Sequence, residues 1–206
     1  SRGDHHSLSP GCAGVMKLPI PPRPDRVLRP DFTFIDVESS ALVSGYPVEV
    51  AFCDDGLNVS KWLVRPHERW AALNWNDEAQ AIHGLTQAYL QAEGMPAEQV
   101  AAEIADRLTG IRFIWSDNPA YDAHWLGHLV ALHPSPVWSG LSVYHEAGAL
   151  AQALGEATAA AAWALRKDDV VELVRATFPH VHRAGPDSLS LASRFRLFAD
   201  EVYFEE

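Results

Sequence analysis

The chain has 206 residues, of which 48% are hydrophobic and 10% are aromatic. This length and composition predict a single globular domain with a sizeable core and argue against a disordered chain. The formal net charge of −11, from 16 basic and 27 acidic residues, argues against a protein that holds long duplex DNA through its phosphates. It leaves room for a local contact with nucleic acid where divalent cations neutralise the acidic side chains.

Membrane insertion and disulfide bonding are both disfavoured. No apolar run reaches the roughly 18 residues that span a bilayer, and no charged-then-apolar signal segment opens the sequence. The two cysteines, Cys12 and Cys53, provide neither a disulfide framework nor a cysteine-type zinc site. We therefore expect no membrane partner and a reducing, cytoplasmic location.

The first part of the chain reads as a leader or linker. Residues 1–30 are rich in proline and glycine and show little apolar periodicity, so we expect the folded domain at 31–206. His5 and His6 indicate a flexible tail or a tag remnant rather than a metal site, and Met16 is a candidate natural start. The sequence leaves open whether the residues before Met16 are native.

The folded part begins with three apolar segments separated by turn signals: FTFID from Phe32, PVEVAFC from Pro47 and VSKWLV from Val59. Short connections between them predict an antiparallel meander. The later predicted elements are, in chain order, helices at 77–83 and 96–108, a strand at 111–115, a helix at 119–132, a strand at 137–143, an Ala-rich stretch at 158–178 and a helix at 186–198. This order predicts an α/β fold with a mixed five-stranded sheet flanked by helices.

Two acids close the first strand. Asp36 and Glu38 are two residues apart, so their side chains point to the same face of the strand. Two carboxylates held this close repel each other and raise a pKa, unless a cation lies between them or water screens them. The alternative is an exposed strand end, where such a pair is harmless.

A third acid follows the strand at 111–115. Asn118 and Pro119 indicate the start of a helix, which places Asp122 near its first turn, where the side chain can face the end of the sheet. The alternative for Asp122 is a surface residue that complements the helix dipole.

A fourth acid lies in the stretch HVHRAGPDS. Gly185 and Pro186 mark another helix start, with Asp187 in the first turn and His182 just before it. On one regular helix His182 and Asp187 would diverge, but a junction between a loop and a helix lets both side chains converge on one point. A surface histidine and a dipole-complementing aspartate are the alternatives.

Together these segments resemble the three motifs of the DEDDh 3′–5′ exonucleases. That family includes the proofreading subunit of bacterial replicative polymerase, ribonuclease T and oligoribonuclease, and its fold is ribonuclease H-like. The residues that carry the resemblance are Asp36-x-Glu38, Asn118-x-x-x-Asp122 with Leu126, and His182-Arg183-Ala184-x-x-Asp187. Weaker matches are Ser39-Ser40-Ala41-Leu42, Ile82-His83-Gly84-Leu85-Thr86 and Gly94-Met95-Pro96. The resemblance covers about 32–198.

Three departures from the family pattern stand out. Asp117 precedes Asn118 where many relatives carry histidine, which makes Asp117 a rival metal ligand. Ala41 replaces the usual glycine. The segment 142–181 has no clear match to the family's helix, which leaves substrate choice most open there.

The resemblance implies a mechanism. Asp36, Glu38, Asp122 and Asp187 would hold two Mg²⁺ or Mn²⁺ ions, with Asp36 as the bridging ligand. His182 would take the proton from the attacking water. The substrate would be the 3′ end of single-stranded DNA or RNA, the product a nucleoside 5′-monophosphate, and the matched segments imply substrate contacts from five residues: Ser39, Ser40, Leu42, His83 and Asn118.

Two other functions compete with this reading. One is a non-catalytic module that binds nucleic acid or protein on the same fold, and the other is a phosphodiesterase for very short oligonucleotides or small nucleotides. The intact acids and His182 weigh against the first. The sequence does not decide between DNA and RNA, between proofreading, repair and RNA turnover, or whether two copies form a homodimer.

Overall fold

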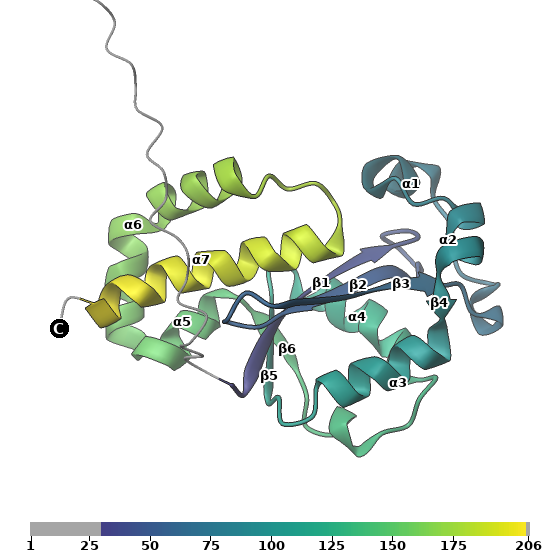
Figure 1. Ribbon diagram of the computed structural model, residues 1–206, viewed down its shortest axis with the longest axis horizontal. Helices are drawn as coiled ribbons and strands as arrows, with labels where there is room; N and C mark the ends of the chain where they lie inside the picture. The colour runs from purple at the N-terminus through teal and green to yellow at the C-terminus, as the bar shows by residue number, and fades with distance from the viewer. Residues whose placement is uncertain (1–29, 205–206) are drawn as a thin grey trace, which may run out of the picture.

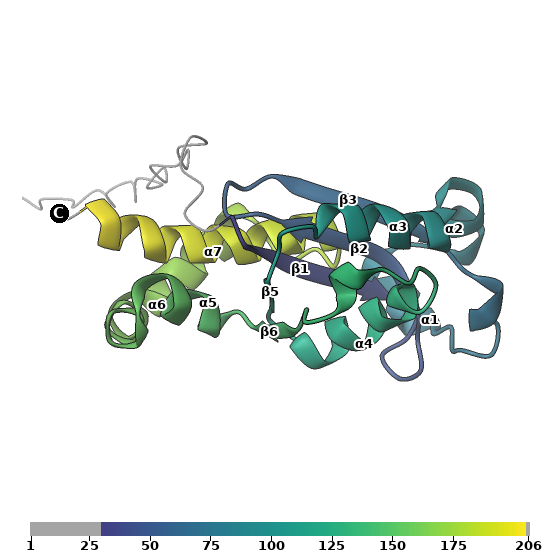
Figure 2. The same cartoon turned by 90° about the horizontal axis from the view of Figure 1, so that it is seen from below.

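The computed structural model describes residues 30–204, apart from the side chains of residues 158, 162, 165–167, 169 and 200–204. The predicted leader, with His5, His6 and Met16, lies outside this range except for Pro30. A single mixed sheet runs through the molecule, with helices on both faces (Figure 1). Helices α5 and α6 lie at one end of the molecule and α1 and α2 at the other (Figure 2).

The sheet has the strand order β4-β3-β2-β1-β5-β6. Its strands are β1 (Phe32–Ser39), β2 (Pro47–Cys53), β3 (Val59–Arg65), β4 (Met95–Pro96), β5 (Phe113–Ser116) and β6 (Val143–His145). The pairs β1–β2 and β2–β3 are antiparallel, which confirms the predicted meander, and β1–β5, β5–β6 and β3–β4 are parallel. The α/β class with a mixed sheet is confirmed. The predicted count of five strands is one too low, because two-residue β4 is too short to show a period.

The helices are α1 (Asp77–His83), α2 (Gln87–Glu93), α3 (Ala97–Arg107), α4 (Pro119–Val130), α5 (Ala147–Leu154), α6 (Glu156–Thr177) and α7 (Ala184–Phe204). Short 3-10 turns occupy Glu68–Trp70 and Pro136–Trp138. The strand predicted at 137–143 is wrong in most of its length. Ser135 caps the turn through its hydroxyl and Pro136 fixes the first helical position, so the chain turns there and β6 begins only at Val143.

Alternation along β1 divides the core into two layers. Ile35 and Val37 pack with residues of α3 and α4 on one face of the sheet. Phe32 and Phe34 face α7 on the other, where both rings contact Phe195, with centroids 5.1 and 5.5 Å away. Burying a phenylalanine stabilises the fold by about 1.5–3 kcal/mol, so β1 is held firmly from both sides.

The same alternation decides where the acids of β1 point. Asp36 and Glu38 continue the face that Phe32 and Phe34 begin, so they lie on the side of α7. Helix α7 crosses β1, β2 and β3 on this face. Its first turn therefore meets the end of β1 where the acids are.

Among the described residues, no helix is long and apolar enough to cross a membrane.

Candidate active site

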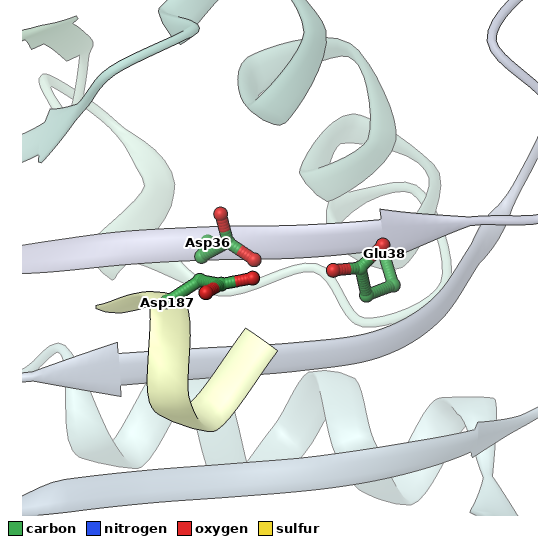
Figure 3. A group of neighbouring side chains, drawn as sticks. All are labelled: Asp36, Glu38 and Asp187. Carbon is green, nitrogen blue, oxygen red and sulfur yellow. The ribbon is translucent and has the colours of Figure 1, made fainter. Parts of the chain in front are cut away.

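Three carboxylates meet where β1 passes the first turn of α7. Asp36, Glu38 and Asp187 each place one oxygen so that the three oxygens lie within 4.8 Å of one another. Asp36 and Glu38 rise from the same side of β1, and Asp187 comes from the start of α7 beside them (Figure 3). Oxygens this close suit a bound divalent cation, which would bring ligands closer still.

Asp122 approaches the same place from the other side of β1. Strand β5 pairs with β1 only as far as Phe34 and Trp115, so the edge of β1 is open at Asp36 and beyond. Asp122, in the first turn of α4, is 3% exposed there and accepts a hydrogen bond of 2.5 Å from the Ser116 hydroxyl. A surface role complementing the helix dipole is thus wrong for Asp122. The three-oxygen group within 4.8 Å does not include it.

Burial and neighbouring acids raise the pKa values of three of these carboxyl groups. Burial raises the pKa of Asp36 well above its usual range, and the charge of Asp122 is the next largest cause. Burial and the nearby Asp187 raise the pKa of Glu38 to about 8, while Arg183 acts in the opposite direction. Burial also raises the pKa of Asp122 to about 7, although hydrogen bonds from Ser116 and the Val37 backbone oppose the rise. A divalent cation among these groups would favour their ionised forms.

Asp187 is anchored by the loop that precedes it. Its side chain is 4% exposed, and its oxygens accept hydrogen bonds from the Val181 and Arg183 backbone N–H groups, at 3.4 and 3.1 Å. The Nδ1 atom of His180 lies 3.2 Å from the Asp187 carboxylate. The histidine in direct contact with Asp187 is therefore His180. The sequence analysis did not single out this residue, although the stretch HVHR contains both His180 and His182.

His182 lies next to this contact. Its ring is partly exposed and packs edge-on against the His180 ring, with centroids 4.0 Å apart. Its backbone has a φ of +52°, in the left-handed region that non-glycine residues rarely adopt. His182 is thus linked to Asp187 through the His180 ring, and its side chain is partly open to solvent.

An ion pair between Glu49 and Arg183 supports the loop that precedes α7. Glu49 on β2 stands opposite Glu38 in the antiparallel register and is 3% exposed. Its carboxylate accepts hydrogen bonds from Arg183 Nε at 3.0 Å, from Arg183 Nη2 at 2.6 Å and from the Ala184 backbone N–H at 2.9 Å. Glu49 was not predicted as a functional residue. The pattern that could have indicated it is a single acidic residue inside the apolar run PVEVAFC.

The serines after β1 are engaged within the protein. The Ser39 hydroxyl donates to the Ala41 carbonyl, and the Ser40 hydroxyl donates to the Asn74 carbonyl and accepts from the Tyr46 backbone N–H. The Ser40 backbone N–H donates to the Tyr46 carbonyl, and the Ser40 carbonyl accepts from the Asn76 N–H. These bonds fix the loop that carries the next residues.

The loop is also close-packed at Gly45. A Cβ there would lie 2.0 Å from the Ala41 carbonyl oxygen, so only glycine fits. Leu42, between these fixed points, is 56% exposed and Val43 beside it is 69% exposed. An apolar side chain held out into solvent by a rigid loop is available for contact with a ligand.

His83 and Asn118 differ in accessibility. His83 ends α1, is 5% exposed, and accepts a hydrogen bond from the Leu85 N–H at Nδ1. Burial lowers its pKa, and Glu49, Arg183 and His182 are close enough to affect it. Asn118 occupies the N-cap position of α4 without a side-chain cap bond, so the expected cap is not made. Its exposed side chain leaves it free to contact a ligand.

Asp117 stays at the margin. It is exposed, and its charge contributes to the raised pKa of both Asp36 and Asp122. It is outside the group of three close oxygens. Asp117 therefore adds negative potential near the site.

Comparisons with known proteins place the fold. No protein-family model and no curated protein matches the chain. Among solved structures, a zinc-bound complex of Escherichia coli exonuclease I with single-stranded DNA superposes with a TM-score of 0.60 at 18% identity, over 84% of this chain and 41% of that one. The same enzyme with a dT13 oligonucleotide gives 0.60 at 17% identity, over 84% and 42%. The moderately thermophilic exonuclease I of Methylocaldum szegediense gives 0.58 at 15%, over 84% and 42%.

The chain thus spans less than half the length of these exonucleases. The TM-scores show a common fold, while identities this low leave activity to be argued from the site. The protein has the ribonuclease H-like fold that exonuclease I also has.

Proposed function

We propose that the protein is a divalent-metal-dependent 3′–5′ exonuclease that acts on single-stranded nucleic acid and releases nucleoside 5′-monophosphates. The observation that carries the proposal is the convergence of Asp36, Glu38 and Asp187 within 4.8 Å, with buried Asp122 close enough to raise the pKa of Asp36. The fold shared with exonuclease I supports it. The order of the acids along the chain, which resembles the DEDDh motifs, supports it independently.

The donor set fits hard divalent cations. Every group in the cluster offers carboxylate oxygens, which Mg²⁺ and Mn²⁺ prefer, and burial together with neighbouring acids raises the pKa values of Asp36 and Glu38, an effect that a bound cation would oppose. We assign Asp36, Glu38, Asp122 and Asp187 as ligands of two such ions, with Asp36 shared. When bound, these ions would neutralise the phosphate and lower the pKa of the attacking water.

The histidine of the loop supplies the base. We assign to His182 the removal of the proton from the attacking water, since its ring packs against His180, which contacts Asp187, and is partly open to solvent. His180 contacts the Asp187 carboxylate and packs edge-on against the ring of His182. It would hold Asp187 and His182 in their relative places.

The remaining residues would recognise the strand end. Leu42 projects from its fixed loop and would wedge against the terminal base, and Asn118 is exposed at the start of α4. The backbone at Ser39 and Ser40 would approach the terminal sugar, and buried His83 would form the floor beneath the last nucleotide. A site that reads only the last nucleotide also accepts short substrates.

The test is degradation of labelled strands in Mn²⁺. We expect 5′-labelled single-stranded DNA or RNA to give a ladder that shortens from the 3′ end, and a 3′ label to leave at once as a mononucleotide. Asp36→Asn should be inactive and Asp106→Asn, an exposed aspartate of α3, should match wild type.

The other outcomes would reassign the protein. Cleavage restricted to dinucleotides would favour the short-substrate phosphodiesterase. No cleavage of DNA, RNA or dinucleotides by the wild type would favour a binding module.

A further inference from the structure

The irregular segment before α7 is tied to the sheet by one side chain. Residues 178–183 lie in neither helix nor strand. Arg183 leaves this segment and makes two parallel hydrogen bonds to Glu49 on β2, 134 positions earlier in the chain. A guanidinium that forms two parallel bonds with a carboxylate fixes orientation as well as distance.

The two partners differ in exposure. The Glu49 side chain is 3% exposed and the Arg183 side chain 39%. Glu49 also accepts the Ala184 N–H, so one carboxylate oxygen binds both the side chain of Arg183 and the first residue of α7. Glu49 is therefore a rigid buried anchor, and the Arg183 side chain is the arm that reaches it.

The anchored residue directly follows the strained one. His182 has a φ of +52°, a conformation that persists only where the surroundings hold it. On its other side, His180 contacts both His182 and Asp187. Asp187 belongs to the first turn of α7 and accepts hydrogen bonds from the backbone N–H groups of Val181 and Arg183, so it is linked to the Arg183 side chain only through this backbone.

We propose that Glu49 and Arg183 are positioning residues that hold the left-handed turn at His182 and so aim its ring at the reacting water. The inference rests on the proposed function for its catalytic part. Neither residue touches the reacting atoms. Their contribution is orientation, whose loss by an ångström can lower a rate by about 100-fold.

The first experiment separates turnover from binding. We expect Glu49→Ala to lower kcat about 10- to 100-fold, with the KM for a 5′-labelled strand and the Kd for Mn²⁺ within about twofold of wild type. Glu49→Gln keeps one oxygen for Arg183 Nε and Ala184 but loses the acceptor for Arg183 Nη2, so it should recover part of the loss. The matched control is Glu103→Gln, because Glu103 also accepts side-chain hydrogen bonds, from Trp62 and Gln99, on the opposite layer of the sheet. A wild-type kcat in Glu49→Ala would overturn the proposal.

The second experiment tests whether the contact between Glu49 and Arg183 acts through His182. If Glu49 acts through His182, Glu49→Ala should have little further effect on kcat in a His182→Ala background. A loss of full size in that background would mean that Glu49 acts elsewhere, and would overturn the assignment.

A third readout does not depend on activity. In the metal-free protein, the ring signals of His182 in NMR spectra should shift in Glu49→Ala and stay in place in Glu103→Gln. Unchanged His182 signals in Glu49→Ala would overturn the positioning role of Glu49 and Arg183, whether or not the enzyme is active. If the wild type has no activity but the His182 signals shift in Glu49→Ala, the proposed function is rejected and the positioning of His182 by Glu49 and Arg183 is retained as a structural feature.

Discussion

The carboxylates of Asp36 and Asp187 lie within 4.8 Å of each other although they are 151 positions apart in the chain. Core side chains fix strand β1, and α7 packs against the same face of the sheet. The two acids therefore cannot move apart without disrupting this packing. The fold thus holds together charges that repel each other. Such arrangements are typical of functional sites.

Neutralising one of these acids should separate stability from activity. We expect Asp36→Asn to lose at least about 100-fold in nuclease rate, since changes to groups that merely support metal ligands already cost 10–100-fold. The same variant should melt at a higher temperature than wild type in EDTA, because it removes a buried charge among like charges. Scanning fluorimetry with and without EDTA measures this shift. A lower melting temperature in EDTA would mean that Asp36 stabilises the fold.

The metal-free protein should become less stable as the pH rises. Asp36, Glu38 and Asp122 have pKa values above those of the unfolded chain, near 4, and for Glu38 and Asp122 the folded values are about 8 and about 7. Between these limits the folded state binds more protons than the unfolded state, so the free energy of unfolding falls with rising pH.

Urea unfolding at pH 5, 6.5 and 8 in EDTA measures this dependence. We expect a fall on the order of a few kcal/mol across the range, and a smaller fall in Glu38→Gln. Saturating Mn²⁺ should offset the loss at pH 8, because a ligand that binds only the folded state stabilises it. Equal free energies of unfolding at pH 5 and 8 in EDTA would contradict the raised pKa values of Asp36, Glu38 and Asp122.

The two histidines of the loop should contribute unequally. His182→Ala should lose about 10²- to 10⁴-fold in kcat, the usual contribution of a general base, while still binding Mn²⁺. His180→Ala should lose less, because that residue acts only by supporting Asp187 and His182. Single-turnover rates and Mn²⁺ titrations of both variants decide between them. The reverse order of losses would transfer the base role to His180.

The exposed loop after β1 should affect binding of the strand. We expect Leu42→Ser to raise the KM for single strands several-fold and to change the kcat for a dinucleotide less. The reason is that the Leu42 side chain would pack against the terminal base. Val59→Ser, which changes another exposed apolar residue on β3, serves as the control. Equal KM values for Leu42→Ser and wild type would remove Leu42 from the substrate site.

The sequence predicted the parts of this site that depend on local rules. Alternation along a strand placed Asp36 and Glu38 on one face, and the turn signals between the first three strands predicted their antiparallel order. The start of α7 near Pro186 followed from the proline rule. The position of Asp122 at the start of α4 was predicted in the same way, although its burial was not.

Other features depend on contacts that no short pattern contains. Glu49 and Arg183 are separated by 134 positions, and only the path of α7 over the sheet brings them together. The contact of His180 with Asp187 depends on the left-handed turn at His182, which nothing in HVHR announces. Helices α2 and α5, of seven and eight residues, were not predicted.

Diffraction at the manganese edge, from crystals grown with Mn²⁺ and a nucleoside 5′-monophosphate, addresses the cluster of acids most directly. We predict anomalous peaks for two ions, both in contact with Asp36 and held further by Glu38, Asp122 and Asp187, with the nucleotide phosphate beside them. Crystals with the nucleotide and Mn²⁺ but no anomalous peak among these carboxylates would contradict the proposed metal site.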